Sequence, residues 1–171
     1  MAEQAPNDPH HEDRDDRHPD PGRLADRLRT AVSRFHSSGR PAVLLCAAVR
    51  RLDSFVAALG HAAGRTLVSR LSDRFRERLS AGQTLVRLPE NRLAVLAEGA
   101  EADDPLELAQ RLRILAAAPL RAGGAEVPVD LVVGIAPVAE RHATARDVLD
   151  DALTALAWTT MSSGSSCQRS T

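Results

Sequence analysis

The hydrophobic pattern of this chain changes from irregular to periodic at Asp20. From Pro21 to Phe35, apolar side chains return every three or four residues, which predicts an amphipathic helix with Asp20 as its cap. The segment Ser37–Pro41 then stops this helix. Residues 42–49 are all apolar, which is typical of a central strand that is covered on both faces.

The rest of the pattern predicts further helices and strands. Gly60 closes one helical stretch. The segment Pro89–Asn91 predicts a hairpin turn, because Pro presets the first turn position and Asn tolerates a positive φ. Helix starts are indicated where Asp104 precedes a proline and where Thr144 precedes Asp147. The expected elements are helices at 52–59, 67–79, 104–119 and 144–156, and strands at 83–88, 92–97 and 127–138.

The order of these elements, (α)βααββαβα, defines the expected fold class. It predicts an α/β (α+β) domain with a single mixed sheet and flanking helices, packed mainly on one side of the sheet. A hairpin in mid-order excludes a purely parallel, doubly wound sheet. The expected divisions are a disordered polar tail at 1–19, one domain at 20–160 and a flexible Ser-rich tail at 161–171.

Charge and cysteine content exclude several classes of function. The chain has 22 Lys and Arg against 23 Asp and Glu, so we expect neither nucleic acid nor a membrane as a partner. The arginines within 70–78 are interleaved with acids, and we interpret them as a solvated face rather than a nucleic-acid patch. Cys46 and Cys167 lie in an apolar run and a polar tail and are not expected to pair. Without a leader-like or long apolar segment, a cytoplasmic location is expected.

The N-terminal tail carries histidines and aspartates that could bind a metal weakly. No spacing among them matches a metal site of known geometry, so a solvated tail is the simpler interpretation. These residues are His10, His11, Asp13, Asp15, Asp16 and His18.

Several segments together resemble the GGDEF domain of diguanylate cyclases, in order and in spacing. The resemblance runs from about Asp26 to Arg92, more loosely to Trp158, and implies a nucleotidyl-cyclase-like palm. Leu59–Gly64 matches the LGHxxG segment of that family, and Val132–Ala136 resembles its SIGIA strand. The other similar segments are 26–34 and 38–45, like its first helix and strand, and 85–88 and 93–96, like the hairpin strands around its signature.

The resemblance implies where a cyclase would hold metal and base, and those residues are replaced here. Two metal-binding aspartates of the family, in the pattern DxD, fall on Ala48 and Arg50, so Mg²⁺ binding is not expected. The Asn and Asp that contact guanine and ribose fall on Val56 and Ala57. The acid that follows LGHxxG falls on Arg65.

The signature itself is also replaced. Its glycines allow substrate close to the hairpin backbone, whereas Pro89 removes an amide and Glu90 adds bulk and charge. The metal-binding acid falls on Asn91, and the next acid falls on Arg92. A phosphate-binding Lys of the family falls on Thr160.

The product-inhibition site of the family, an RxxD, falls on Ser80–Gln83. Neither the cation nor the acid is present, so cyclic-di-GMP is not expected to bind by that route. Trp158, near the end of a helical stripe, is interpreted as the edge of the core, and an exposed Trp158 would instead favour dimerisation.

We therefore expect no catalytic residue and no cofactor. The leading hypothesis is an inactive GGDEF-like domain that acts as a regulatory or protein-interaction module in bacterial cyclic-di-GMP signalling, through a protein partner or self-association. An alternative is a non-catalytic sensor of GTP or cyclic-di-GMP in which Arg50, Arg65 and Arg92 grip an anion, although pairing of these arginines with Asp53 and Glu90 is favoured.

Two further hypotheses are kept open. Residual diguanylate cyclase activity is disfavoured, because every metal-binding carboxylate of the family is missing and rescue would require new ones nearby. The chain could also be a piece of a larger protein, such as the front half of a degenerate GGDEF–EAL pair.

Overall fold

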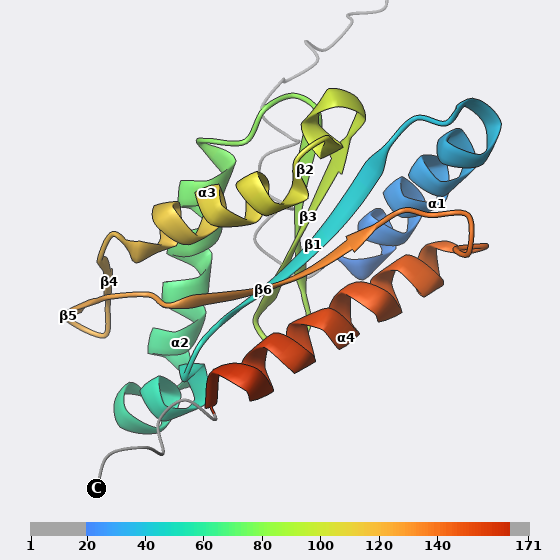
Figure 1. Cartoon of the computed structure of the whole chain (residues 1–171). Helices are drawn as coiled ribbons and strands as arrows, with labels where there is room; N and C mark the ends of the chain where they lie inside the picture. The colour runs from blue at the N-terminus through green and yellow to red at the C-terminus, as the bar shows by residue number, and fades with distance from the viewer. Residues whose placement is uncertain (1–19, 165–171) are drawn as a thin grey trace, which may run out of the picture.

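A four-stranded sheet runs through the middle of the structure, a computed structural model that describes residues 20–164 (Figure 1). Its strands lie in the order β2-β3-β1-β6, and each neighbouring pair is antiparallel. The sheet consists of β1 (Ala42–Val49), β2 (Gln83–Leu88), β3 (Arg92–Glu98) and β6 (Leu131–Pro137). The other elements are α1 (Pro21–Ser38), α2 (Leu52–Arg76), the short 3-10 helix η1 (Gly99–Ala102), α3 (Pro105–Ala117), the hairpin strands β4 (Leu120–Ala122) and β5 (Ala125–Val127), and α4 (Ala145–Gly164).

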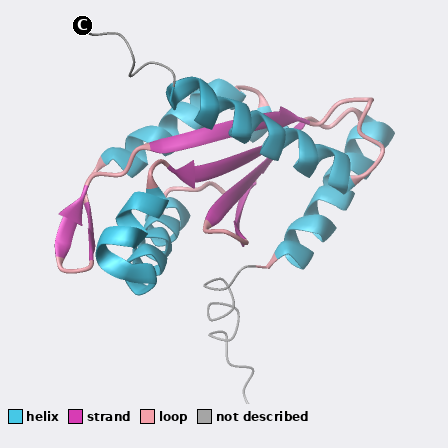
Figure 2. Cartoon of the chain, turned by 90° about the horizontal axis from the view of Figure 1, so that it is seen from below, coloured by secondary structure: helices cyan, strands magenta, loops and turns pink. Residues whose placement is uncertain are grey.

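Helices cover both faces of the sheet (Figures 1 and 2). Alternate side chains of β1 point to opposite faces, so Leu45 packs in a core with Phe75 of α2 and Leu112 of α3. Leu44 packs on the other face, where α1 contributes Leu28 and α4 closes the second core. The expected α/β class with a central sheet and flanking helices is confirmed. The central sheet is antiparallel throughout rather than mixed, and the hairpin β4–β5 forms a second, two-stranded sheet. The expectation of helices mainly on one side is wrong, because the uniformly apolar β1 requires cover on both faces.

The predicted helix starts are confirmed by their caps. Asp20 Oδ1 accepts a hydrogen bond from the backbone N–H of Arg23 at 2.9 Å, and a proline follows at the first position of α1. Asp104 caps α3 in the same way, accepting from the N–H of Glu107 at 2.8 Å. These side chains satisfy N–H groups that have no partner within their own helix.

Three boundaries differ from the expected ones. The last helix, α4, does not end at 156 but continues to Gly164, so residues 161–164 of the expected Ser-rich tail are helical. The two expected helices at 52–59 and 67–79 form one element, α2, interrupted at Gly60, whose φ of 87° and ψ of 163° are not helical. The expected strand at 127–138 is divided, because Pro128 has no N–H to donate and separates the β5 hairpin from β6. At the hairpin turn, the expectation that Pro89 takes the first turn position is wrong. The two central residues are Glu90 (φ 60°) and Asn91 (φ 58°), both left-handed, and Pro89 precedes them.

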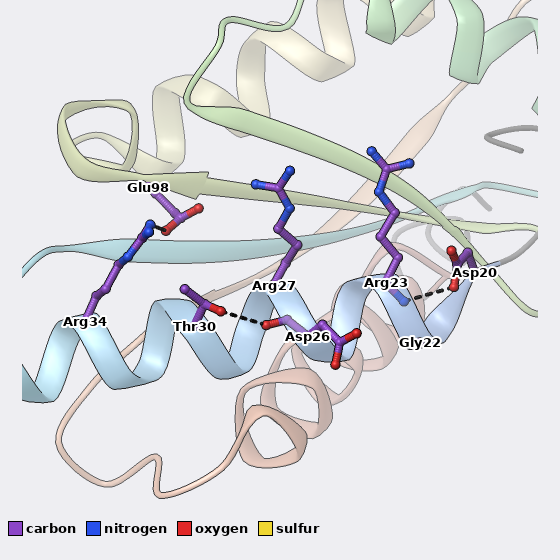
Figure 3. Close-up of a pocket in the computed structure, with 8 residues that line it drawn as sticks. All are labelled: Asp20, Gly22, Arg23, Asp26, Arg27, Thr30, Arg34 and Glu98. Atoms are coloured by element: carbon purple, nitrogen blue, oxygen red, sulfur yellow. Dashed lines mark hydrogen bonds and ion pairs between the residues drawn. The ribbon is translucent and has the colours of Figure 1, made fainter. Parts of the chain in front are cut away.

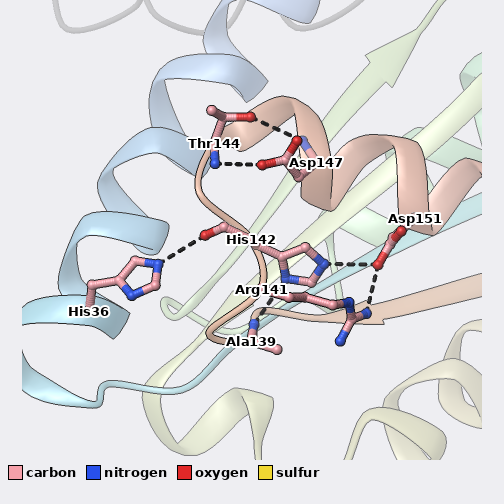
Figure 4. A network of polar contacts seen from close by, with 7 residues as sticks. All are labelled: His36, Ala139, Arg141, His142, Thr144, Asp147 and Asp151. Atoms are coloured by element: carbon pink, nitrogen blue, oxygen red, sulfur yellow. Dashed lines mark hydrogen bonds and ion pairs between the residues drawn. The ribbon is translucent and has the colours of Figure 1, made fainter.

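A buried histidine joins the loop before α4 to α1 (Figure 4). The Nδ1 atom of His142 accepts from the N–H of Ala139 at 3.0 Å, so Nε2 carries the proton and donates to Asp151 Oδ2 at 2.9 Å. The carbonyl of His142 lies 2.9 Å from Nε2 of His36 in α1. Arg141 adds an ion pair to the same Asp151 oxygen at 2.6 Å. The sequence pattern gave no indication of this network.

One arginine of the expected solvated face on α2 has a structural role. Arg74 donates to the carbonyl oxygens of Leu115 and Pro119, each at 3.1 Å, and also to that of Ala118. These carbonyls lie at the C-terminal end of α3, where they lack partners within the helix. The solvated interpretation is therefore wrong for Arg74, which holds α2 against α3.

The remaining expectations about tails lie outside the described residues. These include the polar segment 1–19 with its histidines and aspartates, and Cys167. From 20 to 164, no helix has both the length and the apolar character needed to cross a membrane.

Candidate functional site

A cleft of about 600 Å³ opens between the end of β1, the turn that joins β2 to β3, and the second half of α4. The sequence-predicted positions Ala48, Arg50, Glu90, Asn91 and Arg92 line it together. Antiparallel pairing explains the convergence, because β3 and β6 both flank β1 and bring the hairpin turn and α4 to its C-terminal end. The cleft is therefore the candidate site.

Other predicted positions do not line this cleft. Val56 packs against Gly64, which lies further along α2. A Cβ added to Gly64 would come within 2.5 Å of Val56 Cγ2. Ala57 and Arg65 are exposed on α2, and Pro89 is exposed beside the turn. The expected three-arginine grip therefore does not assemble within the cleft, since Arg50 and Arg92 line it without Arg65.

The residues at the first of the implied metal positions do not fit a divalent cation. Ala48 offers no ligand atom from its side chain, and the side chain of Arg50, two residues later, places a fixed positive charge at the second implied position. Arg50 Nε lies 2.7 Å from Asp130 Oδ2, an ion pair in which the Nε–H is not aligned for a hydrogen bond. Between residues 20 and 164, no group of three or more His, Cys, Asp or Glu side chains could hold a metal ion.

The turn side of the cleft carries a second ion pair. Arg92 lies 2.6 Å from Glu90, as the pairing hypothesis expected, whereas Arg50 pairs with Asp130 rather than with Asp53. Glu90 adopts a left-handed backbone that a glycine would adopt without strain. Below the turn, burial raises the pKa of the Cys46 thiol to about 12, which excludes a reactive thiolate there.

Arg51 is a cleft residue that the sequence analysis missed. It lines the cleft, precedes α2 with φ 59° and ψ 26°, and makes no side-chain capping bond. No acidic partner of Arg51 lies within ion-pair distance among residues 20–164. The doubled arginine at the end of the apolar strand was visible in the sequence, but its backbone conformation and direction were not.

The wall formed by α4 is apolar. It presents Leu153, Leu156, Ala157 and Met161, and its one hydroxyl comes from Thr160, the position of the implied phosphate-binding Lys. Next to this wall, Trp158 is 65% exposed, so its interpretation as the edge of the core is wrong.

The positions of the implied product-inhibition site are used within the fold. Gln83 is buried, donates to Glu101 Oε2 at 3.0 Å and accepts from the N–H of Ser80 at 3.3 Å. These bonds engage both the nitrogen and the oxygen of the Gln83 side chain within the fold.

A second hollow, of about 670 Å³, lies along α1 and contains none of the predicted site residues (Figure 3). It is lined by three arginines and three acids, and two of these residues, Arg34 and Glu98, form an ion pair at 3.2 Å. Although this hollow is somewhat larger, we consider the cleft the candidate site, because five sequence-predicted positions converge there.

Comparison with known proteins agrees with this geometry. The chain is 27% identical to the GGDEF domain of YfiN (TpbB) from Pseudomonas aeruginosa, with a TM-score of 0.78 over 84% of this chain and 91% of that one. It is 26% identical to a sensory box/GGDEF family protein from Caulobacter crescentus, with a TM-score of 0.75 over 83% and 92%. The GGDEF domain of FimX from Pseudomonas aeruginosa, at 21% identity, shares the fold with a TM-score of 0.76 over 84% and 94%.

Among curated proteins, no sequence matches this chain. Residues 21–161 match the family model described as diguanylate cyclase, GGDEF domain. That match spans most of the chain, which therefore belongs to the GGDEF family.

Proposed function

We propose that this GGDEF domain does not synthesise cyclic-di-GMP and acts as a regulatory or protein-interaction module in bacterial cyclic-di-GMP signalling. The single observation that carries the proposal is the state of Arg50, whose guanidinium forms an ion pair with Asp130 at 2.7 Å where the family resemblance implies a metal-binding aspartate. A cation held at that place opposes a divalent metal by charge and by volume.

The other replacements act in the same direction. Diguanylate cyclases depend on metal ions to position phosphates and to stabilise the developing charge, and loss of such an interaction costs about 3 kcal/mol or more of barrier. Ala48 and Asn91 remove further carboxylates, and the α4 wall offers Thr160 in place of a lysine. These losses lie in one cleft and leave no alternative metal cluster within 20–164.

The test is a direct assay for product. The purified full chain is incubated with GTP and either Mg²⁺ or Mn²⁺, and cyclic-di-GMP is measured by mass spectrometry beside an active diguanylate cyclase. We expect no product above the no-enzyme background. Time-dependent formation of cyclic-di-GMP that scales with protein concentration would overturn the proposal.

A second candidate is a non-catalytic nucleotide sensor, which is supported by the persistence of the cleft with Arg50 and Arg92 in its lining. Calorimetric titration with GTP, with and without Mg²⁺, and with cyclic-di-GMP distinguishes it from the first candidate. Metal-independent heat with GTP that is reduced in an Arg92→Ala variant would favour the sensor. Absence of heat with both nucleotides would favour the protein-interaction module.

A further inference from the structure

We propose that the cleft binds, without a metal ion, a carboxylic acid with an alkyl or aryl body. This inference rests on the proposed function, because a metal-loaded nucleotide would compete for the same space. The cleft volume of about 600 Å³ is in the range of small-molecule sites, which are mostly apolar with a few placed polar groups.

One side of the cleft suits the apolar body of such a ligand. The α4 wall contributes Leu153, Leu156, Ala157 and Met161, and β6 adds Val132 beside them. Contact with these side chains would remove apolar ligand surface from water, which is the main driving force for binding an alkyl or aryl group.

The opposite side suits the carboxylate. Arg50, Arg51 and Arg92 line the cleft together with the acids Asp53 and Glu90, and two of these arginines already have an acidic partner. Arg51 has none within the described part of the chain, so its guanidinium is available to bind a carboxylate through two parallel hydrogen bonds.

The backbone of Arg51 supports a binding role. Its φ of 59° lies in the left-handed region, which glycine occupies without strain and an arginine does not. Strain of this kind is concentrated at functional sites, where the side chain is needed despite its conformational cost. Here the strained residue is also the cleft arginine that lacks an ion pair.

A nucleotide fits the two walls less well than this acid. The polar edges of a base or a triphosphate placed against α4 would find a single hydroxyl, from Thr160, among apolar side chains. Unpaired polar groups buried in that way oppose binding. A ligand with one charged end and one apolar end places no polar group of its own against the α4 wall.

The test uses dodecanoate at concentrations where it is monomeric, with the intrinsic fluorescence of Trp158 and calorimetric heat as readouts. Trp158 is the one tryptophan of the chain and follows the cleft residue Ala157 directly. We expect a saturable change with dodecanoate, and at least tenfold weaker binding of the uncharged dodecanol and of metal-free GTP.

Three variants distinguish binding within the cleft from nonspecific adsorption of dodecanoate to the protein surface. Arg51→Gly should weaken dodecanoate binding about tenfold while leaving the melting temperature unchanged or higher, because the guanidinium is lost and the backbone strain is relieved. Ala157→Glu places a carboxylate in the apolar wall and should abolish binding. Thr154→Glu, also exposed on α4 but outside the cleft, should bind as the wild type does.

Several outcomes would overturn the inference. They are equal binding of dodecanol and dodecanoate, an undiminished affinity in Arg51→Gly, equal losses in Ala157→Glu and Thr154→Glu, or no fluorescence change and no heat at all. The cyclase assay distinguishes a failure of the dodecanoate inference from a failure of the proposed function. Product formation from GTP refutes the inactive domain whatever dodecanoate does, and absent dodecanoate binding leaves the result of that assay unchanged.

Discussion

Gly134 of β6 lies where α4 crosses the sheet, and an alanine there should destabilise the fold severely. A Cβ at this position would lie 2.2 Å from Leu156 N, 2.4 Å from Ala152 O and 2.7 Å from Leu156 Cα, whereas ordinary contacts begin at 3.4 Å. All three are backbone atoms, so no rotamer change relieves the overlap. The whole of α4 has to move away from β6.

The expected loss in the free energy of unfolding follows from this overlap. Overpacking typically costs about 1–3 kcal/mol, and here it also loosens Val148, Ala152 and Leu156, which are buried between α4 and the sheet. We therefore expect Gly134→Ala to lose at least about 3 kcal/mol of the free energy of unfolding. For a domain of this size, that loss corresponds to a drop of about 10 °C in melting temperature.

Urea denaturation followed by circular dichroism measures this loss. Gly22→Ala is the matched control, since its Cβ would meet only Asp20 Oδ1 at 3.4 Å in the first turn of α1, and we expect it to be neutral or slightly stabilising. A Gly134→Ala variant within about 0.5 kcal/mol of the wild type would refute such close packing of α4 on β6.

Two further predictions concern contacts that the sequence did not reveal. Arg74→Ala should destabilise the fold by about 2 kcal/mol, because the carbonyl oxygens at the end of α3 lose a charged donor, and urea denaturation measures it. The hydrogen bond from His142, and then that from Arg141, holds the pKa of Asp151 below its usual range. This carboxylate therefore stabilises the fold above the unfolded-state pKa and loses that effect as pH falls through the folded-state pKa. Asp151→Asn should lower the melting temperature at pH 7 and flatten its decline below about pH 4, measured by thermal melts across pH.

Controls make these outcomes decisive. Arg70→Ala, on the exposed side of the same helix, should change stability by less than about 0.5 kcal/mol, and an equal effect of Arg70→Ala and Arg74→Ala would contradict the capping role. For the acid, an exposed carboxylate such as Asp150, whose nearest cation is Arg146 at 3.5 Å, serves as the comparison through Asp150→Asn. Identical pH profiles of the two variants would show that the His142 contact contributes nothing.

Local signals in the sequence predicted most of the elements, because short-range physics decides them. Asp20 and Asp104 were recognised as caps since a carboxylate three residues before an N–H can bond to it without any tertiary contact. The hairpin was recognised from its turn residues between two apolar stretches. The division of the expected strand at 127–138 was missed, because a short hairpin such as β4–β5 has little hydrophobic pattern of its own.

The candidate site was predictable only as a set of positions. The family resemblance placed Ala48, Arg50, Glu90, Asn91 and Arg92 near one another, and the structure brings them into one cleft. The resemblance did not predict that Arg65 lies outside this cleft. The direction of an exposed side chain on α2 depends on how the helix packs against the sheet.

By itself, the sequence determined most of the helices and strands and their order, which follow from residue identity and near-neighbour spacing. The tertiary structure decided which groups meet: Arg50 with Asp130, His142 with Asp151, and Arg74 with the end of α3. These partners are far apart in the chain or on different elements, so their contact depends on packing of the sheet and helices rather than on local preference. The same packing brings the arginines and the apolar side chains of α4 together in the cleft.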